Sequence, residues 1–561
     1  MTLEAAVLTI EHLTIDLPAG SDRPHAVEDV SLVLNRNEIL CVVGESGSGK
    51  SMMARSILGL FPSRHVRASA GRILYGTENL LEAAPDRLRA LRGSRIAMIF
   101  QEPMTALNPV LSIGRQIEEV IAIHEPGPRE PRRQRVLDML TAVHLPDPVR
   151  IFEAYPHQIS GGQRQRAMIA MALTLEPDIL IADEPTTALD VTTQAQILAL
   201  IREIQTARRM AVLFITHDFG VVAEMADRVA VMQRGKLVEL GAAKVILDAP
   251  REAYTRALLA AVPSLVPALP RTSFAQAPVV MQVSGLDKAF RSGSGLFGRN
   301  ARVVHASKAV AFELRLGETL GIVGESGSGK STVARCITRI IEPDAGRILI
   351  GGIDFAQLRA RALRNARRRI QMVFQDPYGS LDPRRTVGKL IAEGPIVHGT
   401  SATAARQRAL ELLELVGLDA RAADRYPHEF SGGQRQRIGL ARALALDPDI
   451  LIADEPVSAL DVSVQEQVLR LLADIRARLG LTVLFITHDL RVAAQVCDSI
   501  AVMRHGEIVV YGLTGAVFAA PQHPYTQELF AAVPGREWSR ARAASTTTAP
   551  VSSRLDAAPD P

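Results

Sequence analysis

The chain has few cysteines and no long hydrophobic run. Its 561 residues include three cysteines, Cys41, Cys336 and Cys497, which stand far apart in apolar surroundings. Their spacing predicts buried, reduced thiols and excludes a zinc site or disulfide framework built on cysteine pairs. The apolar runs, such as residues 179–182 and 211–215, end within a few residues, whereas a membrane-spanning helix needs about 20. We therefore expect a chain that cannot cross a membrane alone.

A surplus of charge of one sign is also absent. The chain has 64 lysines and arginines against 60 aspartates and glutamates, a net charge of +4, which points to no particular partner. The basic stretch at residues 361–369 could contact nucleic acid, but a solvated helix face is the favoured interpretation. The first residues, MTLEAAVLTIEHL, contain acids and no basic segment, so we expect no signal peptide and a cytoplasmic chain.

One eight-residue motif, GESGSGKS, is present twice. The pattern G-x-x-x-x-G-K-[ST] is typical of a phosphate-binding loop, in which backbone amides, a lysine and a hydroxyl reach the phosphates and Mg²⁺. Each copy follows an apolar run typical of a buried strand and precedes a predicted helix, whose N-terminus favours anions. The predicted phosphate-binding residues are Gly44, Glu45, Ser46, Gly47, Ser48, Gly49, Lys50 and Ser51, and in the second copy Gly324, Glu325, Ser326, Gly327, Ser328, Gly329, Lys330, Ser331 and Thr332.

These motifs belong to a repeat of a whole domain. The two loops lie 280 residues apart, and further matched motifs follow in the same order with an offset that settles at 271. A constant offset in the later part is expected for two copies of one fold that diverged in earlier loops. We predict domains at residues 1–261 and 281–535, joined by a proline-rich, semi-rigid linker at 262–280 and followed by a disordered tail at 536–561.

Acidic residues end the repeated run ILIAD. Asp183 and Asp454 stand at the carboxyl end of this predicted strand, where doubly wound sheets collect ligands and an aspartate can organise Mg²⁺. Glu184 and Glu455 follow directly and can orient or deprotonate an attacking water. A pair of structural buried acids is the alternative, which the cost of isolated buried charge disfavours.

Amide and imidazole side chains follow other predicted strands. Gln101 and Gln375 can touch both Mg²⁺ and the water without acting as a base, so with Ser51, Asp183, Ser331 and Asp454 they complete the predicted metal ligands. His217 and His488 can donate to a terminal phosphate. Either histidine alone would be interpreted as a core residue, but the repeated set favours a catalytic role.

A second motif, SGGQRQR, introduces a predicted helix in each copy. Serine and glycine at a helix N-terminus make another anion site. Each domain already has a phosphate loop, so the second site is explained if it closes over a nucleotide held by another domain. The residues concerned are Ser160, Gly161, Gly162 and Gln163, and Ser431, Gly432, Gly433 and Gln434.

Together these motifs resemble the ATP-binding cassette (ABC) ATPase family over nearly all of residues 5–535. Walker A, Q-loop, signature, Walker B, D-loop (ending at Asp190 and Asp461) and H-loop occur twice in order. The resemblance implies an α/β fold of two P-loop NTPase domains, each with a mostly parallel sheet core, an antiparallel β subdomain and a helical subdomain. It also implies ATP and Mg²⁺ as cofactors and two head-to-tail sites, each joining the Walker A loop of one domain to the signature of the other. We expect both sites to be competent ATPases.

A narrower resemblance concerns the Q-loops and tails. FQEPMTALNPVLSIGRQI and FQDPYGSLDPRRTVGKLI are similar to the extended Q-loops of dipeptide, oligopeptide, nickel and glutathione importer ATPases. The tails EAYTRALLAAVPSL and HPYTQELFAAVPG agree, although the first lacks the His-Pro pair. This implies an ATP-hydrolysing, energy-coupling importer subunit on the cytoplasmic face of the bacterial inner membrane. Its partners would be two transmembrane permease subunits and an extracytoplasmic solute-binding protein, without nucleic acid.

Two rival classes have tandem ATPase domains without a permease. A tandem ABC translation factor acting on the ribosome would have a long charged helical linker, whereas this linker is short and proline-rich. A DNA-repair ATPase would need zinc cysteines or a long coiled coil, whereas only 110 residues separate Lys50 from Ser160. The sequence does not name the imported solute. For stacking against adenine, Phe290, His25 and His305 are the candidates.

Overall fold

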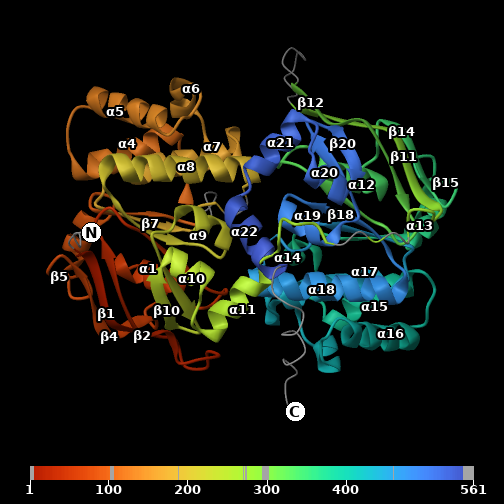
Figure 1. The fold of residues 1–561 in the computed structure, drawn as a ribbon, viewed down its shortest axis with the longest axis horizontal. Helices are drawn as coiled ribbons and strands as arrows, with labels where there is room; N and C mark the ends of the chain where they lie inside the picture. Colours follow the sequence, from red (N-terminus) through yellow and green to blue (C-terminus); the bar gives the residue numbers. More distant parts are fainter. Residues whose placement is uncertain are drawn as a thin grey trace. The chain divides into compact units, whose positions relative to one another are not determined.

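The computed structural model describes residues 6–101, 106–186, 189–268, 271, 274–292, 302–458 and 460–547. The chain divides into two compact units (Figure 1). The first unit comprises Met1–Leu189 and Thr193–Val262, and the second comprises Asp190–Thr192 and Pro263–Pro561. The predicted 262–280 linker therefore falls almost entirely within the second unit.

The first unit contains an antiparallel sheet and a mostly parallel sheet. The antiparallel sheet has the order β2-β1-β4-β5, and the second sheet has the order β10-β9-β3-β8-β7-β6, in which only the β9–β10 pair is antiparallel. The strands are β1 (Ala6–Asp16), β2 (His25–Asn35), β3 (Ile39–Val43), β4 (Arg67–Tyr75), β5 (Glu78–Asn79), β6 (Ile96–Ile99), β7 (Ile179–Asp183), β8 (Ala211–Ile215), β9 (Arg228–Gln233) and β10 (Lys236–Ala242).

Every residue of β3, β7 and β8 is buried, as expected for central parallel strands covered on both faces. The helices that follow or cover the sheets include the long α8 (Figure 1). Their bounds are α1 (Lys50–Ile57), α2 (Pro85–Leu91), α4 (Ile113–His124), α5 (Arg129–Ala142), α6 (Pro148–Glu153), α7 (Gly161–Leu173), α8 (Val191–Arg208), α9 (Phe219–Met225), α10 (Ala243–Asp248) and α11 (Ala253–Ala261), with a short 3₁₀ helix at Pro156–Gln158.

The second unit repeats this architecture. Its antiparallel sheet has the order β12-β11-β14-β15, and its mostly parallel sheet has the order β16-β17-β18-β13-β19-β20, with β19–β20 antiparallel. The strands are β11 (Val279–Ser292), β12 (Arg302–Arg315), β13 (Thr319–Val323), β14 (Ala345–Ile350), β15 (Ile353–Asp354), β16 (Ile370–Val373), β17 (Ile450–Asp454), β18 (Thr482–Thr487), β19 (Ser499–Arg504) and β20 (Glu507–Leu513).

The helices of the second unit also follow the pattern of the first. They are α12 (Lys330–Ile337), α13 (Ala360–Ala366), α14 (Pro377–Ser380), α15 (Val387–Val397), α16 (Ala402–Leu415), α17 (Gly432–Leu444), α18 (Val462–Leu479), α19 (Leu490–Val496), α20 (Thr514–Ala519), α21 (Pro524–Ala531) and α22 (Arg536–Thr547), with 3₁₀ helices at Arg367–Arg369, Ala420–Asp424 and Pro427–Glu429. The predicted fold class, two α/β domains with antiparallel and helical subdomains, is confirmed.

The proline-rich segment at 262–280 is more than a spacer. Gln495 Nε2 donates to the backbone oxygens of Ser264 and Val266 at 2.9 and 2.7 Å. Arg271 forms an ion pair with Asp498, just before β19. The described part of this segment is therefore anchored on the second unit. Hydrogen bonds to its backbone hold it there. Such bonds require no regular spacing of hydrophobic residues, so the sequence pattern does not indicate them.

The predicted disordered tail was wrong over its first part, because residues 536–547 form α22. The Arg542 guanidinium lies 5.5 Å from the centre of the Trp538 ring, and Ser539 is buried. Ser539 Oγ also accepts a bond from the backbone N–H of Leu265 at 3.3 Å. Alanine and arginine favour a helix, and this docking outweighs the polar composition on which the prediction relied. Residues 548–561 lie outside the described residues.

Two expectations from composition can be compared with the structure. All three cysteines are buried, as predicted. Burial raises the pKa of Cys336 to about 11 and raises the pKa values of Cys41 and Cys497 as well. No helix among the described residues has the length and apolar character needed to cross a bilayer.

Candidate active sites

Each Walker A loop joins a central strand to a helix and packs closely under neighbouring backbone. Gly44 and Gly49 have φ values of +147° and +103°, which L side chains rarely adopt. A Cβ at Gly44 would also collide with the carbonyl oxygen of Met232, and one at Gly49 with that of Ala26. The loop thus has to be built from glycine at these positions, with the first turn of α1 beginning at Lys50.

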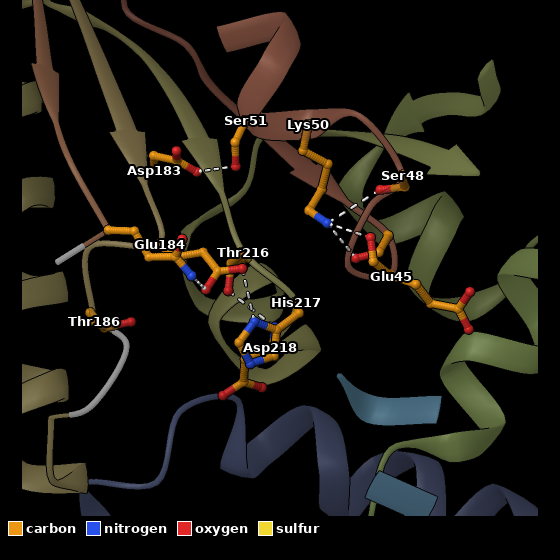
Figure 2. Close-up of polar contacts among 12 residues, drawn as sticks. Glu45, Ser48, Lys50, Ser51, Asp183, Glu184, Thr186, Thr216, His217 and Asp218 are labelled. Carbon is orange, nitrogen blue, oxygen red and sulfur yellow. Dashed lines mark hydrogen bonds and ion pairs between the residues drawn. The ribbon is translucent and has the colours of Figure 1, made fainter. Parts of the chain in front are cut away.

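The Walker A lysine is buried inside its own loop. Lys50 Nζ donates to the carbonyl oxygen of Gly44 at 2.7 Å. It also donates to the carbonyl oxygen of Glu45 at 2.8 Å and to Ser48 Oγ at 3.3 Å (Figure 2). In the second unit Lys330 makes the corresponding two carbonyl bonds, both at 2.7 Å. Each lysine is 5% exposed, and burial lowers the pKa of Lys330. The loop therefore holds a desolvated cation beside its backbone amides.

The Walker A serine and the Walker B aspartate are brought together. Ser51 Oγ donates to Asp183 Oδ1 at 2.8 Å (Figure 2), and Ser331 Oγ donates to Asp454 Oδ1 at 2.9 Å. Burial raises the pKa of both aspartates. The second carboxylate oxygen of Asp183 is buried and has no hydrogen-bond partner among the described residues.

This pair fits Mg²⁺, because hydroxyl and carboxylate oxygens are hard ligands and one buried oxygen lacks a partner. The described residues hold no cluster of three or more His, Cys, Asp or Glu side chains suited to a metal. Such a sparse set suits an ion that is shared with substrate phosphates and water rather than caged by protein.

The residue after each Walker B aspartate is the centre of a three-residue contact. Gln101 Nε2 donates to Glu184 Oε2 at 2.9 Å. His217 Nδ1 lies 3.2 Å from Glu184 Oε1 (Figure 2). The second unit repeats both contacts around Glu455, with Gln375 Nε2 at 2.8 Å and His488 Nδ1 at 3.1 Å. A proton on Nδ1 donates to the carboxylate, so both glutamate oxygens are oriented.

The backbone turns these glutamates out of the sheet. Glu184 and Glu455 have φ values of +47° and +48°, in the left-handed region, where a residue with a side chain costs about 1–3 kcal/mol. Their N–H groups donate to the carbonyl oxygens of Ile215 and Ile486 at 3.0 and 2.9 Å, which holds the turn in place. Strain of this kind persists where the surrounding structure fixes a functional side chain.

The electrostatics of the Glu455–His488 pair in the second unit favour a charged glutamate. Burial alone would raise the pKa of Glu455, but the hydrogen bond and charge of His488 lower it overall. Burial alone would lower the pKa of His488, but the bond to Glu455 and its charge raise it overall. The carboxylate is therefore ionised and able to accept a proton, with the imidazole as its partner.

Each signature serine caps its own helix. Ser160 Oγ accepts from the N–H of Gln163 at 3.2 Å, and Gln163 Oε1 accepts from the N–H of Ser160 at 3.0 Å. Ser431 and Gln434 repeat this reciprocal cap at α17. Such a cap fixes the first turn of the helix and leaves the amides of its two glycines at the N-terminus.

Other predicted residues contact these sites less directly. Asp190 Oδ1 accepts from Thr192 Oγ1 at 2.9 Å, and its charge acts on Lys330 within the second unit. Asp461 is the residue before α18. Of the adenine candidates, His25 Nδ1 lies 2.8 Å from Asp16 Oδ1, while Phe290 and His305 are exposed, so adenine stacking stays a prediction. Residues 102–105 of the first extended Q-loop, and 187–188 and 459 of the D-loops, lie outside the described residues.

Sequence reasoning missed one residue of each site. The hydroxyl of Tyr254, in α11, accepts a bond from the N–H of Glu45 at 3.3 Å. Tyr525, in α21, makes the same contact with Glu325 at 3.3 Å. The signal for these residues is the Tyr-Thr pair shared by the two tails, which by itself indicates the subfamily and not a contact with the Walker A loop.

Comparison with known proteins agrees with this geometry. The chain matches the ABC transporter family at residues 27–187 and 307–458, and the C-terminal region of oligopeptide/dipeptide transporters at 238–285 and 511–553. It is 48% identical over 565 residues to the glutathione import ATP-binding protein GsiA of Salmonella typhimurium (strain LT2), covering 96% of this chain and 91% of that protein. GsiA of Escherichia coli O157:H7 is 47% identical with the same coverage.

Among solved structures, a dimeric bacterial ABC transporter cassette is 32% identical, covering 42% of this chain and 98% of its own, with a TM-score of 0.38. The full-length relatives are importer subunits, so the alternative of a ribosomal translation factor is not supported. Two family matches, each spanning a Walker A loop and its Walker B strand, account for most of the repeat. The chain therefore belongs to the ABC transporter family, as an ATP-hydrolysing, energy-coupling subunit of an importer.

Proposed function

We propose that Glu184 and Glu455 are the general bases of two Mg²⁺-dependent ATPase sites in this subunit. The observation that carries the proposal is the repeated contact of each glutamate with a glutamine amide and a histidine imidazole. Each glutamate follows an aspartate that already bonds the Walker A serine. An oriented, ionised carboxylate next to a phosphate-binding loop is suited to take a proton from an attacking water.

The other residues have distinct roles in this proposal. Lys50 and Lys330 bind phosphate oxygens together with the loop amides, because each ammonium already lies within its loop. The serine–aspartate pairs, with Gln101 and Gln375, would hold Mg²⁺, which neutralises phosphate charge when it is bound. When both ring nitrogens carry a proton, His217 and His488 orient the base through Nδ1 and donate to the terminal phosphate through Nε2.

The partner for each Walker A loop is proposed from the motif content of the two domains. We assign Lys50 to the signature at Ser431, and Lys330 to the signature at Ser160, with Asp190 and Asp461 close to the junctions. Each signature offers the N-terminus of a capped helix, which attracts anions. A chain with two loops and two such helix ends can complete two nucleotide sites by itself.

The imported solute is proposed to be a small peptide, with glutathione as the first candidate. Support comes from the 48% identity to glutathione import proteins and from the match of both tails to the oligopeptide/dipeptide transporter region. The subunit would act at the cytoplasmic face of the inner membrane with two permease subunits and a solute-binding protein. Uptake of labelled glutathione by vesicles holding the assembled transporter, with a labelled dipeptide in parallel, tests the choice of solute. If the vesicles take up neither glutathione nor the dipeptide, this choice of solute is overturned.

The catalytic proposal is tested by Glu184→Gln combined with Glu455→Gln. Loss of a general base costs about 10²–10⁴-fold in rate, so ATP turnover should fall in this range while MgATP binding is retained. Glu176→Gln is a matched control, because Glu176 has a similar left-handed φ of +53° but is exposed on the surface. Turnover of the double variant within about threefold of the control would contradict the assignment of the base.

A further inference from the structure

The C-terminal segment of each domain, residues 252–262 in the first and 523–533 in the second, reaches the Walker A loop of the same unit. In the first unit the contact is made by the hydroxyl of Tyr254, which accepts the N–H of Glu45 at 3.3 Å. In the second unit Tyr525 accepts the N–H of Glu325 at the same distance. The contacting residues lie about 200 positions apart in sequence, so the contact depends on the folded domain.

The tyrosine and the Walker A lysine bind the two backbone polar groups of the same loop residue. The carbonyl oxygen of Glu45 accepts from Lys50 Nζ at 2.8 Å, while its N–H donates to Tyr254. The carbonyl oxygen of Glu325 accepts from Lys330 Nζ at 2.7 Å, while its N–H donates to the tyrosine of its own segment. The second residue of each loop is therefore held at both of its backbone polar groups.

The surroundings of the two tyrosines differ, although the contact is the same. At α21 the imidazole of His523 accepts from the N–H of Tyr525 at 3.2 Å, and the Arg504 guanidinium lies 4.6 Å from the ring centre. At α11 the cap residue is Glu252, which makes no cap bond. Because the histidine cap is present in one copy only, it does not explain why both hydroxyls reach the loop.

We propose that Tyr254 and Tyr525 are positioning residues that fix the Walker A loop of their own domain in its phosphate-binding shape. A loop held in the competent conformation before nucleotide arrives binds more tightly, because apparent affinity falls with the fraction of molecules that are competent. The C-terminal segment is then part of the nucleotide site. Movement of that segment would loosen the loop and lower the affinity for nucleotide.

The chemistry of the hydroxyl suits a permanent contact. Burial raises the pKa of Tyr525 to about 12, so the phenol stays protonated at physiological pH. Tyr525 is 2% exposed, and the following Thr526 is fully buried, which fixes the start of α21 against the domain. In the first unit, Glu239 of β10 accepts the N–H of Arg251 at 2.8 Å and anchors the segment just before α11.

The test is Tyr525→Phe, which removes one hydroxyl and keeps the ring. Binding of MgADP is measured by calorimetry in a Lys50→Ala background, so that the second loop dominates the signal. A single neutral hydrogen bond corresponds to roughly a 2- to 10-fold change in an equilibrium constant, so the dissociation constant should rise by this factor. Hydrogen exchange of the peptide containing Glu325 should become faster as well.

Tyr511→Phe is the matched control, because its hydroxyl donates to the backbone oxygen of Glu313 at 3.0 Å and has no contact with the loop. The inference rests on the proposed nucleotide contacts of the Walker A loops, which Lys330→Ala tests separately in the same assay. If Lys330→Ala abolishes MgADP binding but Tyr525→Phe has the same MgADP affinity as Tyr511→Phe, the positioning role is overturned. The proposed nucleotide contacts of the Walker A loop would then still be supported. A fall in melting temperature without a change in MgADP affinity also overturns it. Tyr254→Phe in a Lys330→Ala background provides a second, independent variant.

Discussion

Removal of Arg271 should destabilise the second unit, although its position in a proline-rich segment predicts little structure. Arg271 Nε donates to Asp498 Oδ1 at 2.8 Å, and a second guanidinium nitrogen bonds the other carboxylate oxygen. The carboxylate of Asp498 is 5% exposed, whereas the arginine side chain is 35% exposed. An arginine-to-alanine change therefore leaves a buried charge without its main partner.

The expected loss of stability depends on the partners that the Asp498 carboxylate keeps after Arg271 is removed. Deleting one member of a buried ion pair costs about 3–5 kcal/mol. The N–H of Thr319 still donates to Asp498 at 2.8 Å, and the Arg476 cation is nearby, so part of the compensation survives. We expect Arg271→Ala to lower the free energy of unfolding of this unit by about 2–3 kcal/mol. Arg470→Ala, which removes an exposed pair within α18, should cost less than about 0.5 kcal/mol.

The single tryptophan provides the assay. Trp538 lies in α22 of the second unit, so its fluorescence during urea unfolding of the full chain reports on that unit. Burial raises the pKa of Asp498 above its usual value, so the native state gains stability as the carboxyl takes up a proton. The deficit of Arg271→Ala should thus be larger at pH 8 than at pH 5. In an Asp498→Asn background the same change should cost little, and an equal cost in both backgrounds would refute the reasoning.

Two further predictions concern the sites and the core. If the domains pair head to tail, Lys50→Ala with Ser431→Arg damages one composite site and should be scarcely worse than Lys50→Ala alone in single-turnover ATP hydrolysis. Lys50→Ala with Ser160→Arg should be far worse, and the reverse ranking would show that each domain closes on its own nucleotide. The three buried thiols should react with a maleimide only after denaturation, and rapid labelling of the native chain would contradict their placement in the core.

Much of the fold could be predicted because local chemistry determines it. The run ILIAD is fully buried in both copies, as a central parallel strand requires. At the first and last glycines of each Walker A loop, a positive φ coincides with a close backbone oxygen, which only glycine accepts; these are Gly44, Gly49, Gly324 and Gly329. The grouping of Gln101, Glu184 and His217 was also predictable, because parallel strands place their carboxyl ends at one edge of a sheet and so gather residues that follow β6, β7 and β8.

The contacts that could not be predicted depend on packing between distant segments. Tyr254 reaches Glu45 only because α11 folds back on the loop, and no periodicity indicates the target of a single hydroxyl. Asp227 and Asp498 occupy equivalent positions before β9 and β19, yet Asp227 has a side chain that is 47% exposed and lies 3.8 Å from its arginine. In the described parts of the chain, a packed linker residue covers Asp498 but not Asp227, so the same residue type has a different energetic role in each domain.

Comparison of the two copies shows which contacts the shared motifs determine. The serine–aspartate, glutamine–glutamate, histidine–glutamate and tyrosine–amide distances differ by 0.1 Å or less between units. The histidine cap of α21 has no counterpart at α11, where Glu252 makes no cap bond. Any difference in nucleotide affinity between the sites should therefore include a contribution from the C-terminal segments, which position the loops. Substituting His523 would then narrow the difference in nucleotide affinity, whereas exchanging the eight residues GESGSGKS, which are identical in the two copies, would not.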